Sequence, residues 1–121
     1  MKEIETWTAS IHIGLRKGYG GQIGTAYAVQ DICQEFCDSY KWCVTVTPTL
    51  FVYESGKLRG NEPGAIVGIM QYPRFPLDIK ELKTRTLALA RILMKATNQY
   101  RVSIVFLDKT VMLENDEFVE D

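Results

Sequence analysis

The sequence predicts an α+β fold: a four-stranded antiparallel sheet with two helices on one face and a possible extra C-terminal strand. Three observations predict it. The expected elements follow the order β-α-β-β-α-β, which is the split βαβ plan. The first expected strand alternates apolar and polar residues, as a half-buried strand does. Each expected helix has one apolar stripe, so it can cover a sheet with one side only.

The expected elements are strands at 6–16, 42–53, 65–72, 101–107 and 110–113, and helices at 25–40 and from 78 to about 98. Alternation in the first and the last of the four main strands in sequence order indicates which side of the sheet the helices cover. The residues expected on that side are Trp7, Ile11 and Leu15 in the first strand and Val102, Ile104 and Phe106 in the last.

Capping and turn residues indicate where these elements begin and end. Thr25 is the expected N-cap of the first helix. Asp78 and Glu81 have the spacing of a capping box at the start of the second helix. Pro48 indicates an edge strand, a bulge or a break. Residues 54–64 are rich in polar and turn residues, so a polar loop is expected there.

Composition indicates one domain, residues 1–113, followed by an acidic C-terminal tail, residues 114–121. Hydrophobic residues make up 46% and charged residues 24% of the 121-residue chain, which suffices for one core. A net charge of −1 speaks against a protein that binds DNA or RNA polymers over its whole surface. No apolar run reaches the ~18–20 residues of a membrane span, so no membrane partner is expected.

The cysteines indicate a reduced, cytoplasmic setting. Cys33, Cys37 and Cys43 are odd in number and form no disulfide framework. They also lack the spacing of a zinc motif, so ordinary buried thiols are expected, with no metal and no cofactor. The N-terminus lacks the apolar stretch of a secretory signal, which agrees with an intracellular protein.

The sequence offers little for catalysis. His12 is the single histidine, and the first strand gives it no carboxylate or nucleophile. No carboxylate pair stands out as an acid/base couple, so the chain is predicted not to be an enzyme. The glycine-rich loop at residues 18–24 is interpreted as a flexible turn, with anion binding by its free amides as the alternative.

A set of cationic and aromatic residues indicates a nucleotide-like ligand: Arg16, Tyr72, Arg74, Phe75 and Arg101. Arginine pairs bidentately with phosphate and stays charged at any relevant pH. Aromatic faces stack on bases, typically for ~1–3 kcal/mol each. The alternative is that the arginines are solvated strand ends and that Phe75 fills the core. Pro73 and Pro76 restrict φ around this segment, so it would lose little entropy on binding.

Four segments resemble the first Thoeris anti-defence family of phage proteins. They are WTASIHIGLRKGY, VTVTPTLFVY, PGAIVGIMQYPRFP and QYRVSIVFLDKTVMLE, and they span most of the chain. The resemblance implies a small, non-enzymatic sponge that sequesters cyclic ADP-ribose isomers, the messengers of bacterial TIR-domain defence, in the host cytoplasm. It also implies a homo-oligomer, dimeric or larger, and in some members a separate site for cyclic oligonucleotides.

The resemblance also assigns roles to residues. Arg16 and Arg101 are expected to bind the pyrophosphate and Phe75 to stack on the adenine, with Tyr72 and Arg74 as neighbours. The remaining candidates are expected to contact the riboses or to form a second site. These are Arg85 and Asn98, with Thr84 an equal alternative to Arg85.

Two other functions stay open from the sequence. One is a regulatory or interaction module of the split βαβ type that binds a metabolite at a subunit interface. The other is a small isomerase or hydrolase that uses His12. Stabilisation by metabolites rather than cyclic nucleotides would favour the first, and loss of turnover in His12→Ala would favour the second.

Overall fold

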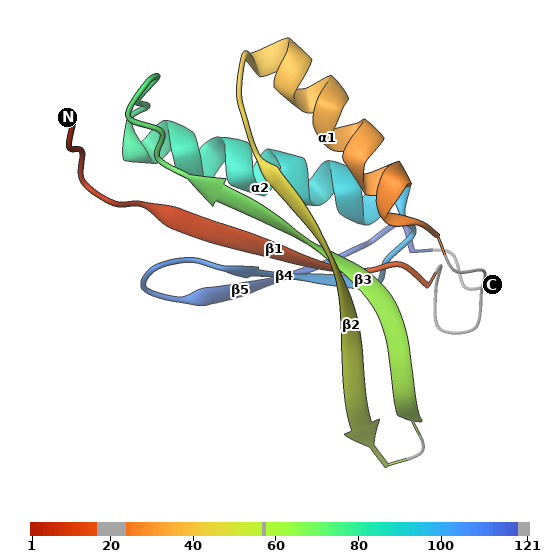
Figure 1. Cartoon of the computed structure of the whole chain (residues 1–121). Helices are drawn as coiled ribbons and strands as arrows, with labels where there is room; N and C mark the ends of the chain where they lie inside the picture. Colours follow the sequence, from red (N-terminus) through yellow and green to blue (C-terminus); the bar gives the residue numbers. More distant parts are fainter. Residues whose placement is uncertain (17–23, 57, 119–121) are drawn as a thin grey trace.

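The structure, a computed structural model, describes residues 1–16, 24–56 and 58–118 and forms a five-stranded antiparallel sheet with two helices on one face (Figure 1). The elements are β1 (Thr8–Gly14), α1 (Ala26–Tyr40), β2 (Thr45–Ser55), β3 (Leu58–Met70), α2 (Ile79–Ala96), β4 (Arg101–Val105) and β5 (Thr110–Glu114). The strand order is β2-β3-β1-β4-β5. The predicted α+β class, two-helix layer and extra C-terminal strand are confirmed.

The core lies between the sheet and the two helices. In β1 the alternation holds: Ala9, Ile11 and Ile13 are buried, whereas the residues between them are half-buried on the open face. Apolar stripes on the helices cover this side, through Val29, Cys33 and Phe36 of α1 and Leu82, Leu89 and Leu93 of α2. Every residue expected on the helix-covered side of the first and last main strands is buried. Each fully buried aliphatic side chain contributes roughly 1.5–3 kcal/mol.

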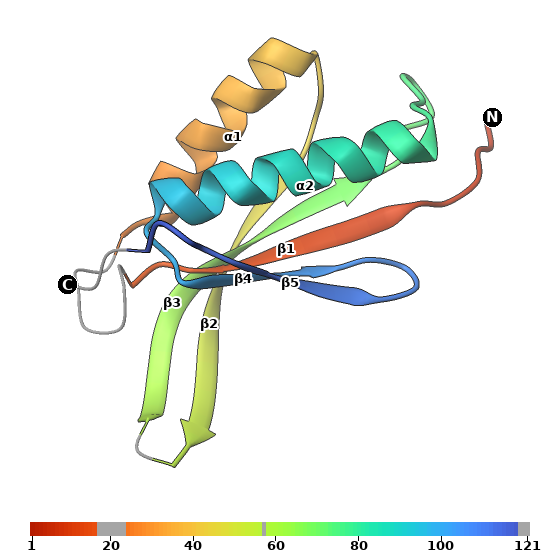
Figure 2. The same ribbon diagram turned by 180° about the vertical axis from the view of Figure 1, so that it is seen from behind.

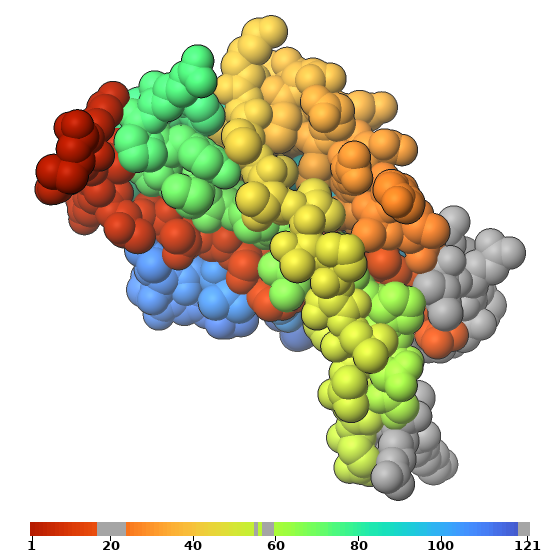
Figure 3. Space-filling view, viewed as in Figure 1, coloured from red at the N-terminus to blue at the C-terminus, as the bar shows by residue number. Residues whose placement is uncertain are grey.

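The hairpin of β2 and β3 is longer than predicted. Its ladder runs from Thr45 opposite Gly68 to Ser55 opposite Leu58. The prediction of a polar loop over residues 54–64 is therefore wrong for most of that segment. β1 pairs with β3 only as far as Gly64, so the outer half of the hairpin projects from the body as an arm (Figures 1 and 3). Solvent reaches both faces of this arm, which removes the alternation that would have identified a strand.

Pro48 lies on β2, and β2 is an edge strand, as the proline indicated. The hairpin connection contains Gly56, whose φ of 59° lies in the left-handed region that glycine adopts at little cost. The arm is thus a two-stranded ribbon whose ladder extends to the pair of Ser55 and Leu58.

The helix ends agree with the sequence in one case and differ in the other. The Thr25 side chain accepts a hydrogen bond from the Ala28 amide at 3.4 Å, as an N-cap should. Asp78 occupies the N-cap position of α2 but makes no side-chain cap bond. The predicted capping box is wrong because the Glu81 carboxylate points along the helix to Arg85 instead.

The C-terminal segment is attached to the body where it leaves β5. Asn115 is buried, and its side-chain amide donates to the Gln99 carbonyl at 3.1 Å. The division into a domain of residues 1–113 and a tail of 114–121 stays a prediction. The glycine-rich turn expected at residues 18–24 lies outside the described residues except for Gly24. Among the residues that the structure describes, no helix is long and apolar enough to cross a membrane.

Candidate functional site

The connection between β3 and α2, residues 71–76, forms a fixed loop that we call the lip. Gln71 closes it with its side-chain amide. The Nε2 group donates to the Leu77 carbonyl at 2.6 Å, and Oε1 accepts from the Leu77 amide at 2.9 Å. The Gln71 backbone amide also donates to the Trp7 carbonyl at 2.9 Å, which ties the lip to the segment before β1. The lip is therefore held at both ends by hydrogen bonds as well as by its two prolines.

The two aromatic side chains of the lip pack together. The ring centroids of Tyr72 and Phe75 lie 5.3 Å apart, with 31° between the ring planes. The backbone forms a turn here, since the Phe75 amide donates to the Tyr72 carbonyl at 3.2 Å. Phe75 is 39% exposed, so the alternative that it fills the core is wrong. Arg74 is exposed between them, which places a cation beside an accessible aromatic pair.

Tyr72 is kept in its neutral form by its surroundings. A hydrogen bond with the Cys43 side chain, followed by partial burial, raises the pKa of the Tyr72 hydroxyl to about 12. Cys43 is exposed, just before β2, so the lip contacts the start of that strand. At neutral pH the phenol is a hydrogen-bond donor, and its ring orientation is fixed by this contact and by Phe75.

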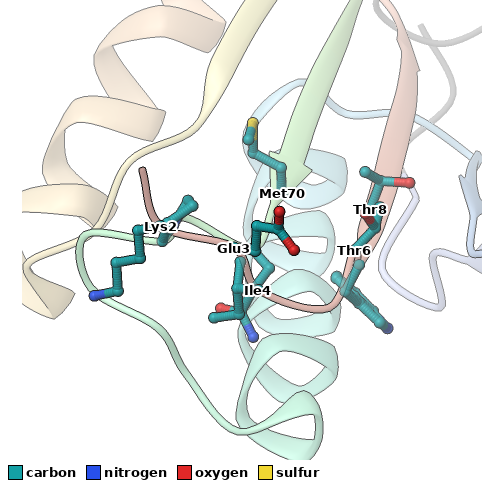
Figure 4. Close-up of a pocket in the computed structure, with 9 residues that line it drawn as sticks. Lys2, Glu3, Ile4, Thr6, Thr8 and Met70 are labelled. Carbon is teal, nitrogen blue, oxygen red and sulfur yellow. The ribbon is translucent and has the colours of Figure 1, made fainter.

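A pocket of about 470 Å³ opens on the side of the lip that faces the N-terminal segment. Gln71 and Pro73 line it from the lip. In Figure 4 Lys2, Glu3 and Ile4 lie across from Met70 at the end of β3. Its size is within the range of small-molecule sites. Tyr72 and Phe75 do not line this pocket, so the aromatic pair lies outside it.

Arg16 and Arg101 lie at the same end of the sheet, together with Gln99. The register of β1 and β4 puts Ser10 opposite Val105 and His12 opposite Ser103, so both arginines belong to the open face. The buried side chain of Gln99 donates to the Arg16 carbonyl at 2.6 Å. The Arg101 guanidinium lies 4.4 Å from the centroid of the Tyr100 ring and is exposed.

Two carboxylates belong to the same end of the sheet, those of Glu62 and of Glu114, which lies opposite Arg101 in the register of β4 and β5. A Cβ added to Gly14 would lie 3.0 Å from both the Glu62 carboxylate and the Gln99 amide oxygen, so these two side chains meet above Gly14. No ion pair within 4.0 Å joins Glu62 to an arginine in the described part of the chain. We call this group, Arg16, Glu62, Gln99 and Arg101, the arginine end. The sequence interpretation missed Glu62 because it placed residue 62 in a loop rather than on the open face of β3.

The lip and the arginine end lie at opposite ends of the sheet. Thr8 pairs with Met70, directly before the lip, whereas Arg16 comes eight residues later, just beyond the end of β1. At roughly 3.3 Å per residue, about 26 Å separates the two groups. Figures 1 and 2 agree, because the connection from β3 to α2 and the C-terminal end of β1 appear at opposite ends of the body. The lip and the two arginines therefore do not form one site within a single chain, and the predicted site residues stay a prediction.

Arg85, one of the two expected ribose-binding residues, is engaged within the chain. Its guanidinium bonds the Glu81 carboxylate at 2.8 Å and the Tyr40 carbonyl at 3.2 Å. It also lies over the rings of Tyr40 and Trp42, 5.0 and 5.7 Å from their centroids. These contacts join α2 to the C-terminal end of α1. Arg85 thus has a structural role in the free chain.

The other candidates are also in structured surroundings. Asn98 has a φ of 48° in the turn from α2 to β4, a conformation that asparagine tolerates better than most residues. The Thr84 hydroxyl donates to the Lys80 carbonyl at 2.9 Å. His12 and Ser10 share a hydrogen bond of 2.9 Å on the open face. None of these positions belongs to the lip.

The three cysteines are free thiols of different exposure. Cys33 is buried and Cys37 half-buried, but Cys43 is exposed, so the expectation of buried thiols is wrong for one of the three. Burial, followed by the neighbouring Cys37, raises the pKa of Cys33 to about 12. No group of three potential metal ligands occurs among the described residues.

The whole fold is similar to solved structures of a phage SAM lyase. The structure in the apo state matches with a TM-score of 0.71 at 15% sequence identity, over 93% of this chain and 92% of that chain. The complex with S-methyl-5'-thioadenosine matches with a TM-score of 0.67 at 12% identity, over 94% and 93%. At these identities the likeness establishes the fold alone. No family model and no curated protein matches the sequence.

The comparison corrects one prediction. Both matched structures are of a lyase, so this fold is one that supports catalysis. The prediction that the chain is not an enzyme is contradicted by that finding. It rested on the isolated His12 and on the lack of paired carboxylates in the sequence. Neither observation excludes a site built from groups on separate strands, such as the arginine end.

Proposed function

We propose that this chain binds an adenosine-containing small molecule, a cyclic ADP-ribose-type nucleotide, between the lip of one copy and the arginine end of another. The observation that carries this proposal is the aromatic pair of Tyr72 and Phe75, half-exposed on a loop that Gln71 holds in place. A rigid aromatic surface stacks on a purine and loses little entropy on binding. The resemblance to the first Thoeris anti-defence family supplies the class of nucleotide.

The arginine end provides the charge that the phosphates require. Arg101 is exposed and rests against the Tyr100 ring, which limits the conformations of its long side chain. Arg16 is anchored at its carbonyl by the buried Gln99. Two guanidinium groups on one face match a pyrophosphate through charge-assisted, bidentate hydrogen bonds. Arg74 on the lip adds a third cation if the two ends meet across an interface.

The proposal requires a homo-oligomer because the two groups are separated within one chain. A compact cyclic nucleotide does not span about 26 Å, so one chain cannot offer both the rings and the arginines. Two copies can, if the lip of one packs near the arginine end of the other. In the proposed role the protein intercepts, in the host cytoplasm, a messenger made by TIR-domain defence proteins.

The affinity test is calorimetric titration with a panel of cyclic ADP-ribose isomers, cyclic oligonucleotides and S-methyl-5'-thioadenosine. Saturable binding of a cyclic ADP-ribose isomer is expected, with affinity lowered at least tenfold in Phe75→Ala and in Arg101→Ala. Tyr27→Ala is a matched control, since Tyr27 is an exposed aromatic residue on α1. Normal binding by both site variants would refute the proposed site.

The composite geometry is tested by mixing the two variants. A chain with Phe75→Ala retains its arginine end, and a chain with Arg101→Ala retains its lip. After co-refolding, mixed oligomers contain sites with both intact halves, so part of the binding capacity should return. If the site lay within one chain, mixing would restore nothing, and the proposal of a shared site would fail even with binding intact.

A second candidate function is cleavage of an adenosine-containing substrate. The fold shared with a phage SAM lyase favours it, and Glu62 supplies a carboxylate next to Gln99 at the arginine end. The test incubates the protein with S-adenosylmethionine, or with the bound nucleotide, and separates the products by chromatography. Formation of S-methyl-5'-thioadenosine that is lost in Glu62→Gln would support this candidate. Recovery of both compounds unchanged after many hours would remove it.

A further inference from the structure

A second pocket lies between α2 and the hairpin of β4 and β5, and it shares no residue with the lip or the arginine end. Its volume is about 260 Å³. Its floor is apolar, formed by Leu87, Phe106, Val111 and Leu113. Its rim carries three cations, Lys83, Arg91 and Lys109.

Local structure explains why these residues meet. Lys83, Leu87 and Arg91 are spaced four apart, so they form one row along α2 with the apolar residue between the two cations. Lys109 lies in the turn of the hairpin, where its carbonyl accepts a hydrogen bond from the Phe106 amide at 2.8 Å. The positions of all three cations are thus set by a helix and a closed turn.

The aromatic floor is also fixed. Phe106 is 7% exposed, and its ring lies 6.1 Å from that of Trp7, at an interplanar angle of 55°. Leu87, Val111 and Leu113 are half-buried beside it and pack against the core. The pocket therefore offers a preformed surface for an apolar group of about the size of one ring.

The three rim cations form no ion pair with a carboxylate among the described residues. No carboxylate lies within 4.0 Å of Lys83, Arg91 or Lys109 there. Arg91 also lines a neighbouring pocket that contains three acidic residues, and one of them, Glu117, pairs with Lys95 at 3.8 Å. Three cations around an apolar floor attract an anion and favour one that carries an apolar body.

We propose that this pocket is a binding site for a small anion that bears a single aromatic ring, an aryl phosphate or aryl carboxylate. The anionic group lies among the three cations and the ring rests on Phe106. A nucleotide bound at the lip would leave this pocket open. The two sites therefore bind their ligands independently. A failure of the proposed function would leave this inference unaffected, and the reverse also holds.

The test is a titration followed by NMR, with phenyl phosphate as the probe and inorganic phosphate and phenol as comparison ligands. Saturable shifts of the methyl groups of Leu87, Val111 and Leu113 are expected with phenyl phosphate, at an affinity at least tenfold above either comparison ligand. The double variant Arg91→Gln, Lys109→Gln should lose most of this affinity. Lys80→Gln, an exposed cation on the same helix outside the pocket, should leave it unchanged.

Three results would overturn the proposal. Absence of saturable shifts at 10 mM phenyl phosphate (about 2.7 kcal/mol of binding free energy at this concentration) would show that no useful site exists. Equal affinity for inorganic phosphate would indicate a surface counterion site, and equal affinity for phenol would indicate an apolar hollow. A near-ultraviolet circular dichroism spectrum equal to that of the unmodified protein confirms that the variants are folded.

Discussion

The amide clamp of Gln71 allows the sharpest test of the candidate site. Gln71→Met keeps the length and the apolar stem of the side chain but removes both hydrogen bonds to Leu77. The matched control is Gln30→Met. It makes the same chemical change at an exposed position on α1, away from the lip. The comparison therefore isolates the two hydrogen bonds from the general effect of replacing glutamine.

The magnitude follows from the two bonds. Each typical intramolecular hydrogen bond contributes about 0.5–1.5 kcal/mol net, so removing both should cost about 1–3 kcal/mol. With an unfolding entropy of about 2.1 cal/mol/K per residue, a 121-residue chain loses roughly 4 °C in Tm for each kcal/mol. If the lip opens locally, the Leu77 amide, which donates to Gln71, should exchange about 5–150-fold faster because each 1.4 kcal/mol is tenfold.

Two measurements check the clamp. Urea denaturation gives the global change, and hydrogen exchange of the Leu77 amide gives the local one. Ligand affinity should fall with the loss of the clamp, since a looser lip pays an ordering cost on binding. If Gln71→Met changes neither the free energy of unfolding nor the exchange of Leu77 relative to Gln30→Met, the lip is not held as described.

Three further predictions test the packing around the site. Arg85→Lys keeps the charge but loses the flat guanidinium over Tyr40. Urea denaturation should show that the free energy of unfolding falls by about 1–2 kcal/mol, with ligand affinity unchanged. A tenfold loss of affinity in the folded variant would instead indicate that Arg85 contacts the ligand. Gly64→Ala would bring its new methyl group into the Phe51 ring and against the Ile13 carbonyl, and should cost about 1–3 kcal/mol. Combination with Phe51→Ala should remove the part of this cost that is due to the ring, so strict additivity would contradict the contact with Phe51. The free energy of unfolding under reducing conditions should fall from pH 9 towards 12. The reason is that the unfolded chain releases the Cys33 proton near a pKa of 9.0, whereas the folded chain holds it to a pKa of about 12. An equal dependence of the unfolding free energy on pH in Cys33→Ala would refute this assignment.

The sequence predicted the fold class because burial is periodic over short distances. Alternation in β1 and the apolar stripes of both helices are local patterns, and the structure confirms them. The length of β3 could not be found in this way. Gly60 and Pro63 are residue types typical of turns. Because the arm is solvated on both faces, no alternation of apolar and polar residues marks it as a strand.

The candidate site was predictable only in its parts. Proline spacing indicated a stiff lip, but the clamp depends on a contact between Gln71 and Leu77 that no short motif encodes. The position of Arg16 relative to the lip depends on strand direction and register. Because β1 and β3 are antiparallel, the end of β3 meets the beginning of β1, which carries the lip away from Arg16.

The strand order has a consequence for how the chain folds. β1 is made first, yet it occupies the centre of the sheet, with β3 on one side and β4 on the other. Its partners come much later in the chain, as the pairs Gly14 with Gly64 and Ser10 with Val105 show. The two hairpins can form early from neighbouring residues, whereas β1 must close long loops to reach them. Synthesis therefore leaves one hydrogen-bonding edge of β1 unpaired until β4 has emerged, and a chain that stops before β4 would present this edge to other molecules.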